Sequence, residues 1–186
     1  MTKTIEIFAG PNGSGKTTFS EKILEKRKEP IIINTDKIAS GITLRNSEYA
    51  QFEAGRVMLN QMESAFAGNK TFAFETTMSG RIWTSHLKKA RTSGYHIIIY
   101  FIFVRSIALS LKRIQNRVKE GGHNIPENIV KRRFKRTFEN FMRLYKPLAD
   151  EWFIIDNSEG GNLVAKKTFQ DGEQILESKT FKKYFL

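Results

Sequence analysis

The stretch Gly10–Thr18, with the sequence GPNGSGKTT, constrains the fold of this 186-residue chain more than any other. Four of its residues satisfy the pattern G-x-x-x-x-G-K-[ST] of a phosphate-binding loop, or P-loop: Gly10, Gly15, Lys16 and Thr17. The β-branched run Thr4–Phe8 before the loop predicts a strand, and the apolar spacing after it predicts a helix over Lys16–Lys28. In such a strand–loop–helix unit, backbone N–H groups and the N-terminus of the helix face a bound phosphate.

The P-loop therefore predicts a nucleotide site. We expect Lys16 to reach the β- and γ-phosphates, and the hydroxyl of Thr17 to be a ligand of Mg²⁺. The predicted nucleotide contacts comprise the whole loop: Gly10, Pro11, Asn12, Gly13, Ser14, Gly15, Lys16, Thr17 and Thr18. The motif specifies nucleotide binding and leaves the reaction open.

Further strands and helices alternate along the chain. Strands are predicted at 31–34, 71–74, 96–104 and 152–155, and helices at about 47–67, 81–92, 106–120 and 127–145. Gly68-Asn69 and Ser93-Gly94 are helix stops. The alternation predicts an α/β fold of the P-loop NTPase type, in which helices cover both faces of a five-stranded parallel sheet. Residues 1–186 are expected to form one domain, with a β-hairpin and a short basic helix at about 162–186.

Composition excludes several classes of function. The chain contains no cysteine, which excludes disulfides, thiolate metal sites and thiol catalysis and is typical of a reducing compartment. No apolar run approaches the ~20 residues that a membrane-spanning helix needs. The P-loop begins so early that we expect no signal peptide. A cytoplasmic location without membrane contact is the resulting expectation.

Carboxylates follow two of the predicted strands. In parallel sheets, ligands bind beyond the carboxyl ends of the strands. Asp36 lies there in the sequence NTDKIA, and could orient the attacking hydroxyl and accept its proton, bind the metal, or cap the next helix. Glu75 closes the apolar strand FAFE, where burying a carboxylate costs free energy unless it meets a metal, a hydroxyl or a cation. Glu75 is therefore predicted to be functional, the alternative being a bond to backbone N–H groups of the next helix.

The segment after Glu75 concentrates hydroxyl groups at the same strand end. Thr76, Thr77 and Ser79 lie in the sequence ETTMSGR, which ends at Arg81. Asp156 closes the last predicted strand of the core and resembles a Walker B carboxylate, but a role in a loop or turn is the favoured interpretation. The predicted substrate-binding residues are Asp36, Glu75, Thr76, Thr77, Arg81 and His123.

Positive charge concentrates in residues 105–146. The net charge of the chain is +12, and this segment holds twelve Lys or Arg against three Glu. Two helices flank a turn that contains Gly121-Gly122, His123 and Pro126. The segment could be a solvated helical face, a lid that brings arginines to a triphosphate, or a nucleic-acid surface. His123 in the turn could contact substrate or be exposed to water.

The chain resembles the zeta-toxin family of P-loop kinases, in particular its short members. The similarity covers about residues 5–158 and is carried by four sequences: FAGPNGSGKTT, NTD with Asp36, FETTMSGR, and RVKEGGHNIP followed by KRRF. The resemblance implies a fold like that of nucleoside monophosphate kinases. Characterised members use ATP and Mg²⁺ to phosphorylate the 3′-hydroxyl of UDP-N-acetylglucosamine, and a small helical antitoxin holds the large members in check.

The resemblance also implies roles for single residues. Asp36 matches the catalytic base, Lys16 and Thr17 match the nucleotide and metal contacts, and Glu75 and Thr76 match the substrate side. Arg117 and one of the pair Arg132 and Arg133 match the catalytic lid arginines. Because the P-loop begins at Gly10, we expect the longer N-terminal region of large zeta toxins to be missing, and we expect a shorter sequence where those proteins build the sugar-nucleotide pocket.

Three functions remain open at this point. The leading one is an ATP- and Mg²⁺-dependent kinase of a sugar nucleotide, with UDP-N-acetylglucosamine as the favoured acceptor. A 5′-polynucleotide kinase would use the basic segment to bind backbone phosphates. A nucleotide-binding ATPase module without an acceptor is the third, although simple binding does not need two carboxylates near anionic phosphates.

Overall fold

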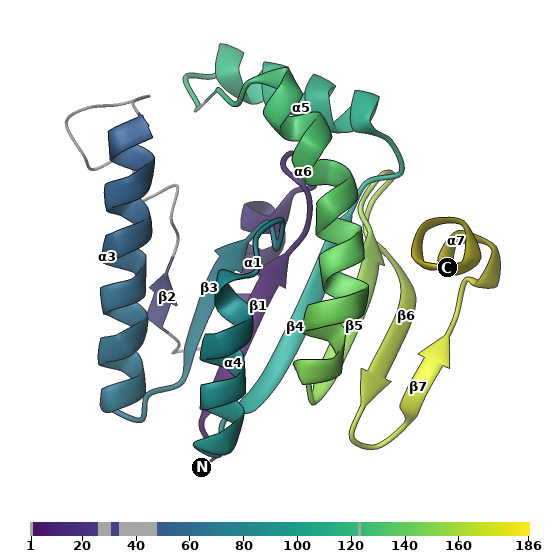
Figure 1. Ribbon diagram of the computed structural model, residues 1–186. Coiled ribbons are helices and arrows are strands. Elements are labelled where there is room, and N and C mark those ends of the chain that lie inside the picture. Colours follow the sequence, from purple (N-terminus) through teal and green to yellow (C-terminus); the bar gives the residue numbers. More distant parts are fainter. Residues whose placement is uncertain (1, 26–30, 34–47, 123) are drawn as a thin grey trace.

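In the computed structural model, which describes residues 2–25, 31–33, 48–122 and 124–186, seven strands form one sheet (Figure 1). Their order in the sheet is β2-β3-β1-β4-β5-β6-β7. The strands are β1 (Thr4–Ala9), β2 (Ile31–Ile33), β3 (Phe72–Thr76), β4 (His96–Phe103), β5 (Glu151–Asp156), β6 (Asn162–Thr168) and β7 (Gly172–Ile175). The first five are parallel, which confirms the predicted α/β architecture.

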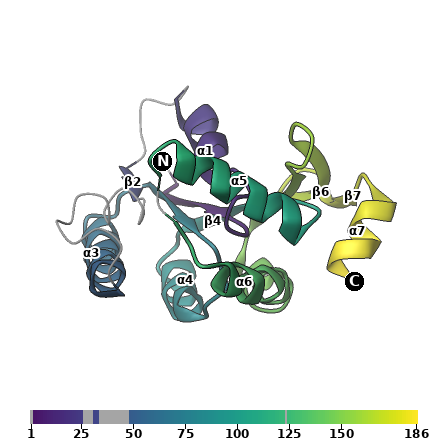
Figure 2. The same cartoon turned by 90° about the horizontal axis from the view of Figure 1, so that it is seen from above.

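Helices cover both faces of the sheet (Figure 2). They are α1 (Lys16–Leu24), α3 (Glu48–Ala67), α4 (Ile82–Thr92), α5 (Ile107–Lys119), α6 (Glu127–Asn140) and α7 (Ser178–Phe185). Helix α1 lies on one face, and α3, α4 and α6 lie on the other (Figure 2). Helix α5 crosses above the carboxyl ends of the strands, where β1 and β4 lead into the loops that precede α1 and α5 (Figures 1 and 2).

Two apolar layers account for this arrangement. Strand β4, with the sequence HIIIYFIF, is apolar on both sides because helices cover both faces of a parallel sheet. Its Ile97, Ile99 and Phe101 pack with side chains of α3, α4 and α6. On the opposite face Phe8 stacks on Tyr100, and both belong to the layer beneath α1. The predicted helix stops are also present, since Asn69 and Gly94 have φ of 50° and 78°.

The C-terminal hairpin differs from its predicted position. We expected a hairpin separate from a five-stranded sheet, whereas β6 pairs antiparallel with β5 and β7 pairs with β6, so that both strands extend the sheet. Val164 and Ala165 of β6 are fully buried. The physical reason is that β5 would otherwise leave a row of unpaired backbone groups beside an apolar surface. Helix α7 then packs Phe185 against Phe101 and Phe141.

The last predicted helix of the core also differs. A single helix was expected over 127–145, but the α-helix ends at Asn140 and continues as a π-helical turn, η1 (Phe141–Tyr145), and a 3₁₀ turn, η2 (Lys146–Leu148). The N–H of Lys146 donates to the carbonyl of Phe141, five residues back. The predicted apolar stripe is present: Val130, Phe141 and Tyr145 are buried, and Phe134 and Phe138 are half-buried. Within the described residues no helix is both long and apolar enough to cross a membrane.

Candidate nucleotide and acceptor site

The P-loop begins where β1 ends, between the ends of β3 and β4. The N–H of Gly10 donates to the carbonyl of Thr76 at 3.3 Å. Gly10 has a φ of 145°, and a Cβ on it would lie 1.8 Å from the carbonyl oxygen of Ile102 in β4. Only glycine fits at this position, because the backbone of β4 comes too close for a side chain and because the positive φ favours glycine.

Polar atoms of the loop are suited to an anion. Ser14 is fully buried, and among the described residues its Oγ has no hydrogen-bond partner, nor does the buried Oδ1 of Asn12. The ammonium group of Lys16 folds back over the loop and donates to the carbonyls of Gly10 and Pro11 at 3.0 and 2.9 Å. Helix α1 starts directly after Gly15, so that its N-terminal N–H groups lie beside the loop.

Glu75 joins the end of β3 to the P-loop helix. Its Oε2 accepts a hydrogen bond from the hydroxyl of Thr17 at 2.8 Å, and its Oε1 accepts one from the hydroxyl of Ser20 at 3.0 Å. The side chain is buried, with 8% of its surface exposed. A hydroxyl and a carboxylate at this distance offer the oxygen ligands that Mg²⁺ prefers in proteins. The predicted metal ligand and the predicted substrate-side carboxylate thus lie together.

Thr76 and Thr77, which follow Glu75, stabilise the loop between β3 and α4. The hydroxyl of Thr76 accepts hydrogen bonds from the N–H of Met78 at 3.1 Å and from Nε1 of Trp83 at 3.2 Å. The hydroxyl of Thr77 is bonded to that of Ser79 at 2.9 Å, and both side chains are half-buried. Arg81 is exposed and precedes the first residue of α4.

The predicted lid arginines lie on α5 and α6. Arg117 is half-buried on α5, and its carbonyl accepts a hydrogen bond from the N–H of Gly122 at 2.8 Å. A Cβ on Gly122 would lie 2.6 Å from Cγ of Arg117, so this glycine lets the turn close against the arginine. On α6, Arg132 is exposed and Arg133 is half-buried beside the apolar stripe, as its sequence position indicates. Asp36 and His123 lie outside the described residues.

Two residues that brace the P-loop were not predicted. The hydroxyl of Ser110, in α5, donates to the carbonyl of Asn12 at 2.5 Å. The amide of Asn157, just after β5, donates to the carbonyl of Ser14 at 2.8 Å. Nη2 of Arg113 in turn donates to the carbonyl of Asn157 at 2.9 Å. The sequence WFIIDNS, in which a polar pair follows a buried strand, was the available signal for Asn157.

Asp156 stabilises the turn after β5. Its buried carboxylate accepts hydrogen bonds from Nε of Arg105 and from the N–H of Ser158, the latter at 2.9 Å. The contact with Asp156 raises the pKa of the Arg105 guanidinium above its ordinary value. Both carboxylate oxygens of Asp156 therefore accept hydrogen bonds from nearby loop residues. This agrees with the favoured interpretation of Asp156 as a loop or turn residue.

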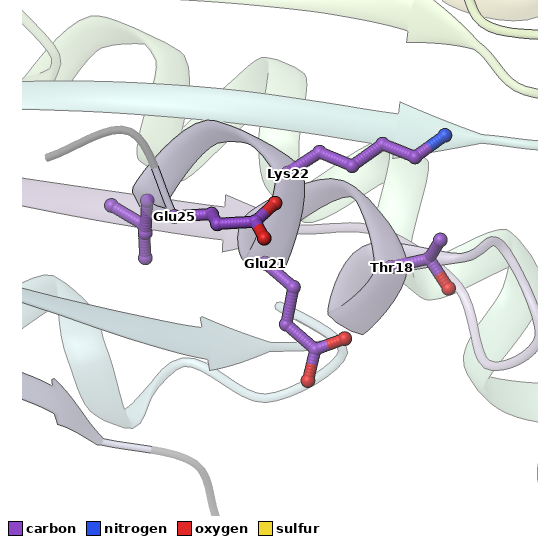
Figure 3. Close-up of a pocket in the computed structure, with 5 residues that line it drawn as sticks. Thr18, Glu21, Lys22 and Glu25 are labelled. Atoms are coloured by element: carbon purple, nitrogen blue, oxygen red, sulfur yellow. The ribbon is translucent and has the colours of Figure 1, made fainter.

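A hollow of about 570 Å³ lies on the flank of α1 (Figure 3). It is lined by Thr18, Glu21, Lys22, Leu24 and Glu25. Only Thr18 in this lining belongs to the predicted site, and two carboxylates against one ammonium disfavour a triphosphate. We therefore place the candidate site at the strand ends, around Lys16, Thr17 and Glu75, and not in this hollow.

Comparisons with known proteins concern the sequence and the fold of the whole chain. The sequence model of the family described as Zeta toxin matches residues 1–163. An uncharacterised protein of Haemophilus influenzae is 34% identical over 128 residues, which are 69% of this chain and 90% of that protein.

Two solved structures resemble the whole chain. The AvrRxo1-ORF1:-ORF2 structure with ATP has a TM-score of 0.76 at 18% identity, over 99% of this chain and 64% of that one. A chain from the PezAT chromosomal toxin–antitoxin system of Streptococcus pneumoniae has a TM-score of 0.69 at 14% identity, over 100% of this chain and 80% of that one. The likeness to these structures shows the fold, and the family match over residues 1–163 shows that the chain belongs to the Zeta toxin family of proteins with a P-loop kinase fold.

Proposed function

We propose that this protein is a kinase that transfers the γ-phosphoryl group of ATP, with Mg²⁺, to a sugar hydroxyl, and that the acceptor is the 3′-hydroxyl of UDP-N-acetylglucosamine. The observation that carries the proposal is the 2.8 Å hydrogen bond between the hydroxyl of Thr17 and Oε2 of Glu75. It joins the residue expected to hold the metal to a carboxylate on β3. This strand leads into the loop between β3 and α4, residues 77–81, which we call the acceptor loop. Burying a carboxylate costs free energy unless it meets a metal, a hydroxyl or a cation, so the position of Glu75 supports a role with Mg²⁺.

The residues at the strand ends fit ATP and Mg²⁺. Gly10 and the buried Oγ of Ser14, which lacks a hydrogen-bond partner in the described part of the chain, belong to a loop that can surround a phosphate. Thr17 and Glu75 would hold the metal. Bound there, Mg²⁺ would offset the negative charge of the phosphates. A similar fold is known with ATP, in the AvrRxo1-ORF1:-ORF2 structure.

The roles of the chain's own groups follow from their chemistry. Lys16 would exchange its two loop carbonyls for phosphate oxygens. Asp36 would accept the proton of the acceptor hydroxyl as that oxygen forms its bond to phosphorus. Arg117, with Arg132 or Arg133, would offset charge on the transferring group, since guanidinium groups suit phosphate oxygens.

A small antitoxin is the proposed protein partner, and the cytoplasm the proposed location. Support comes from the PezAT structure, which belongs to a toxin–antitoxin system. This chain spans 64% of the AvrRxo1-ORF1:-ORF2 chain that it matches. That protein's activity and partners are therefore proposed for this chain and are not inferred from the match alone.

A 5′-polynucleotide kinase is the second candidate, because residues 105–146 carry twelve Lys or Arg against three Glu. Salt dependence of acceptor binding separates the two. An oligonucleotide that displaces several counterions gives a steep dependence on salt concentration, and a single sugar nucleotide gives a shallow one.

The decisive experiment incubates the protein with γ-labelled ATP, Mg²⁺ and a panel of sugar nucleotides and oligonucleotides. We expect label on UDP-N-acetylglucosamine, and none when Lys16→Ala replaces the wild type. Lys22→Ala, an exposed lysine on the same helix, is the matched control and should transfer normally. Label on oligonucleotides would establish the second candidate, and release of inorganic phosphate alone would reduce the protein to an ATPase.

A further inference from the structure

The loop between β3 and α4 has a backbone conformation that its own sequence does not favour. Met78 has a φ of 53°, in the left-handed region that favours glycine, and its side chain is almost fully buried. A change of Met78 to a negative φ would move its buried side chain out of the core. Thr77 and Ser79, on either side of it, carry the bonded pair of hydroxyls described above. Something outside the loop must therefore hold it in this shape.

Two buried side chains from the end of α6 and from η1 hold this loop. Nδ2 of Asn140 donates to the carbonyl of Met78 at 2.8 Å and to that of Gly80 at 3.4 Å. The hydroxyl of Tyr145 also donates to the carbonyl of Gly80, at 2.8 Å. Asn140 has 8% of its surface exposed and Tyr145 none. Their polar groups thus bind a loop that lies sixty or more residues earlier in the chain.

The π-helical turn explains how both side chains reach one loop. In an α-helix, residues five apart differ in direction by about 140°, because each residue turns the helix by about 100°. In η1 the hydrogen bond spans five residues, from the N–H of Lys146 to the carbonyl of Phe141. The wider turn reduces the difference in direction between residues 140 and 145 relative to an α-helix. The turn that interrupts α6 is therefore the feature that lets Asn140 and Tyr145 act together.

We propose that Asn140 and Tyr145 are positioning residues for the acceptor: they fix the loop so that the hydroxyls of Thr77 and Ser79 bind the hydroxyl groups of a sugar. The inference rests on the proposed kinase function. A pair of mutually bonded hydroxyls keeps further donor and acceptor capacity, which suits a polyhydroxylated ligand. The loop directly follows Glu75, so a sugar held there would lie beside the P-loop end of the site.

The test compares two substitutions of the same kind. Tyr145→Phe removes the hydroxyl that donates to the carbonyl of Gly80 and that also interacts with the backbone of Trp83, in the first turn of α4. Tyr95→Phe removes a hydroxyl that donates to the carbonyls of Ala65 and Lys70. The side chain of Tyr95 is also buried, and it precedes the amino end of β4, away from the carboxyl ends of the strands. Both variants lose a bond from a tyrosine to backbone carbonyls, and only Tyr145→Phe loses one at the acceptor loop.

For Tyr145→Phe we expect the KM for the acceptor to rise about three- to tenfold, as for the loss of one hydrogen bond, with kcat and the KM for ATP within about twofold of wild type. Asn140→Asp, which replaces the donor by a carboxylate, should act in the same direction. Amide hydrogen exchange over residues 77–81 should be faster in Tyr145→Phe and unchanged in Tyr95→Phe.

Equal effects of Tyr145→Phe and Tyr95→Phe on the KM for the acceptor would overturn the inference. So would a Tyr145→Phe variant in which kcat, the affinity for the acceptor and the affinity for ATP all fall together. The exchange measurement needs no substrate. If the wild type labels no acceptor, the proposed function fails, whereas unchanged exchange over 77–81 in Tyr145→Phe overturns the positioning role itself.

Discussion

The hydroxyl of Thr17 donates a hydrogen bond to Oε2 of Glu75 at 2.8 Å, across 58 residues of sequence. This contact joins the helix that begins at the P-loop to the strand that ends at the acceptor loop. Because Thr17 is the expected metal ligand, the charge on Glu75 lies where it can influence both the metal and the transferred group. Substitutions at this pair can therefore distinguish effects on ATP binding from effects on phosphoryl transfer.

Glu75→Gln is expected to lower the rate of phosphoryl transfer by at least about 10²-fold, because the amide keeps the shape of the side chain but not its charge. Ser20→Ala is the matched control. It removes the hydrogen bond to Oε1 and leaves Thr17 in place, so it should cost less than about tenfold. Initial rates of phosphoryl transfer from labelled ATP measure the effect of both substitutions. Near-normal transfer by Glu75→Gln would show that the carboxylate serves only to satisfy two hydroxyls.

Asn157→Ala is expected to raise the KM for ATP about three- to tenfold, since the carbonyl of Ser14 loses its donor and the P-loop loses a brace. The kcat should change less, because Asn157 is not placed at the reacting atoms. Asn162→Ala, at an exposed position at the start of β6, is the control. Identical ATP affinities for the two variants would mean that the loop keeps its shape without Asn157.

Asp36→Ala is expected to bind ATP like the wild type but to transfer phosphate about 10²-fold more slowly, the usual contribution of a positioned general base. Nucleotide binding by calorimetry and transfer by labelled ATP measure the two quantities on one sample. Lys16→Ala should lose nucleotide binding as well as transfer. An Asp36→Ala variant that transfers normally would identify Asp36 as a helix cap.

Much of the fold could be predicted from the sequence because its signals are local. The P-loop, the alternation of strands and helices and the apolar stripe from Val130 to Tyr145 each depend on residues a few positions apart, and the structure has all of them. The hairpin within residues 162–186 was also predicted. The pairing of its first strand, β6, with β5 was not predicted, because strand pairing depends on which sheet edge remains open once the core has formed.

The supporting residues of the site were harder to predict, for a related reason. Ser110 lies 98 residues from Asn12, and Asn157 lies 143 residues from Ser14. Asn140 and Tyr145 both contact the acceptor loop, and a π-helical turn lies between them where the apolar spacing predicts an α-helix. A serine or an asparagine has no periodic signal of its own, so such contacts emerge only when the chain is folded.

Tyr145 also provides a test of stability against pH. Burial raises the pKa of Tyr145 to about 12, from an ordinary value of 10.0. Between these values the unfolded chain releases the phenol proton while the folded protein keeps it, so the folded state binds more protons. The contribution of this group to stability is therefore complete below pH 10 and is lost as the pH rises toward 12.

Tyr145→Phe has no phenol to titrate, so it should be less stable than the wild type at pH 8, where it lacks the hydrogen bond to Gly80. This difference should shrink between pH 10 and pH 12. Urea unfolding of both proteins at pH 8, 10 and 11 measures it, and the other ionisable groups cancel because both proteins share them. A difference that stayed constant across this range would mean that the phenol titrates alike in the folded and unfolded chains, and hence that Tyr145 is not held as a buried donor.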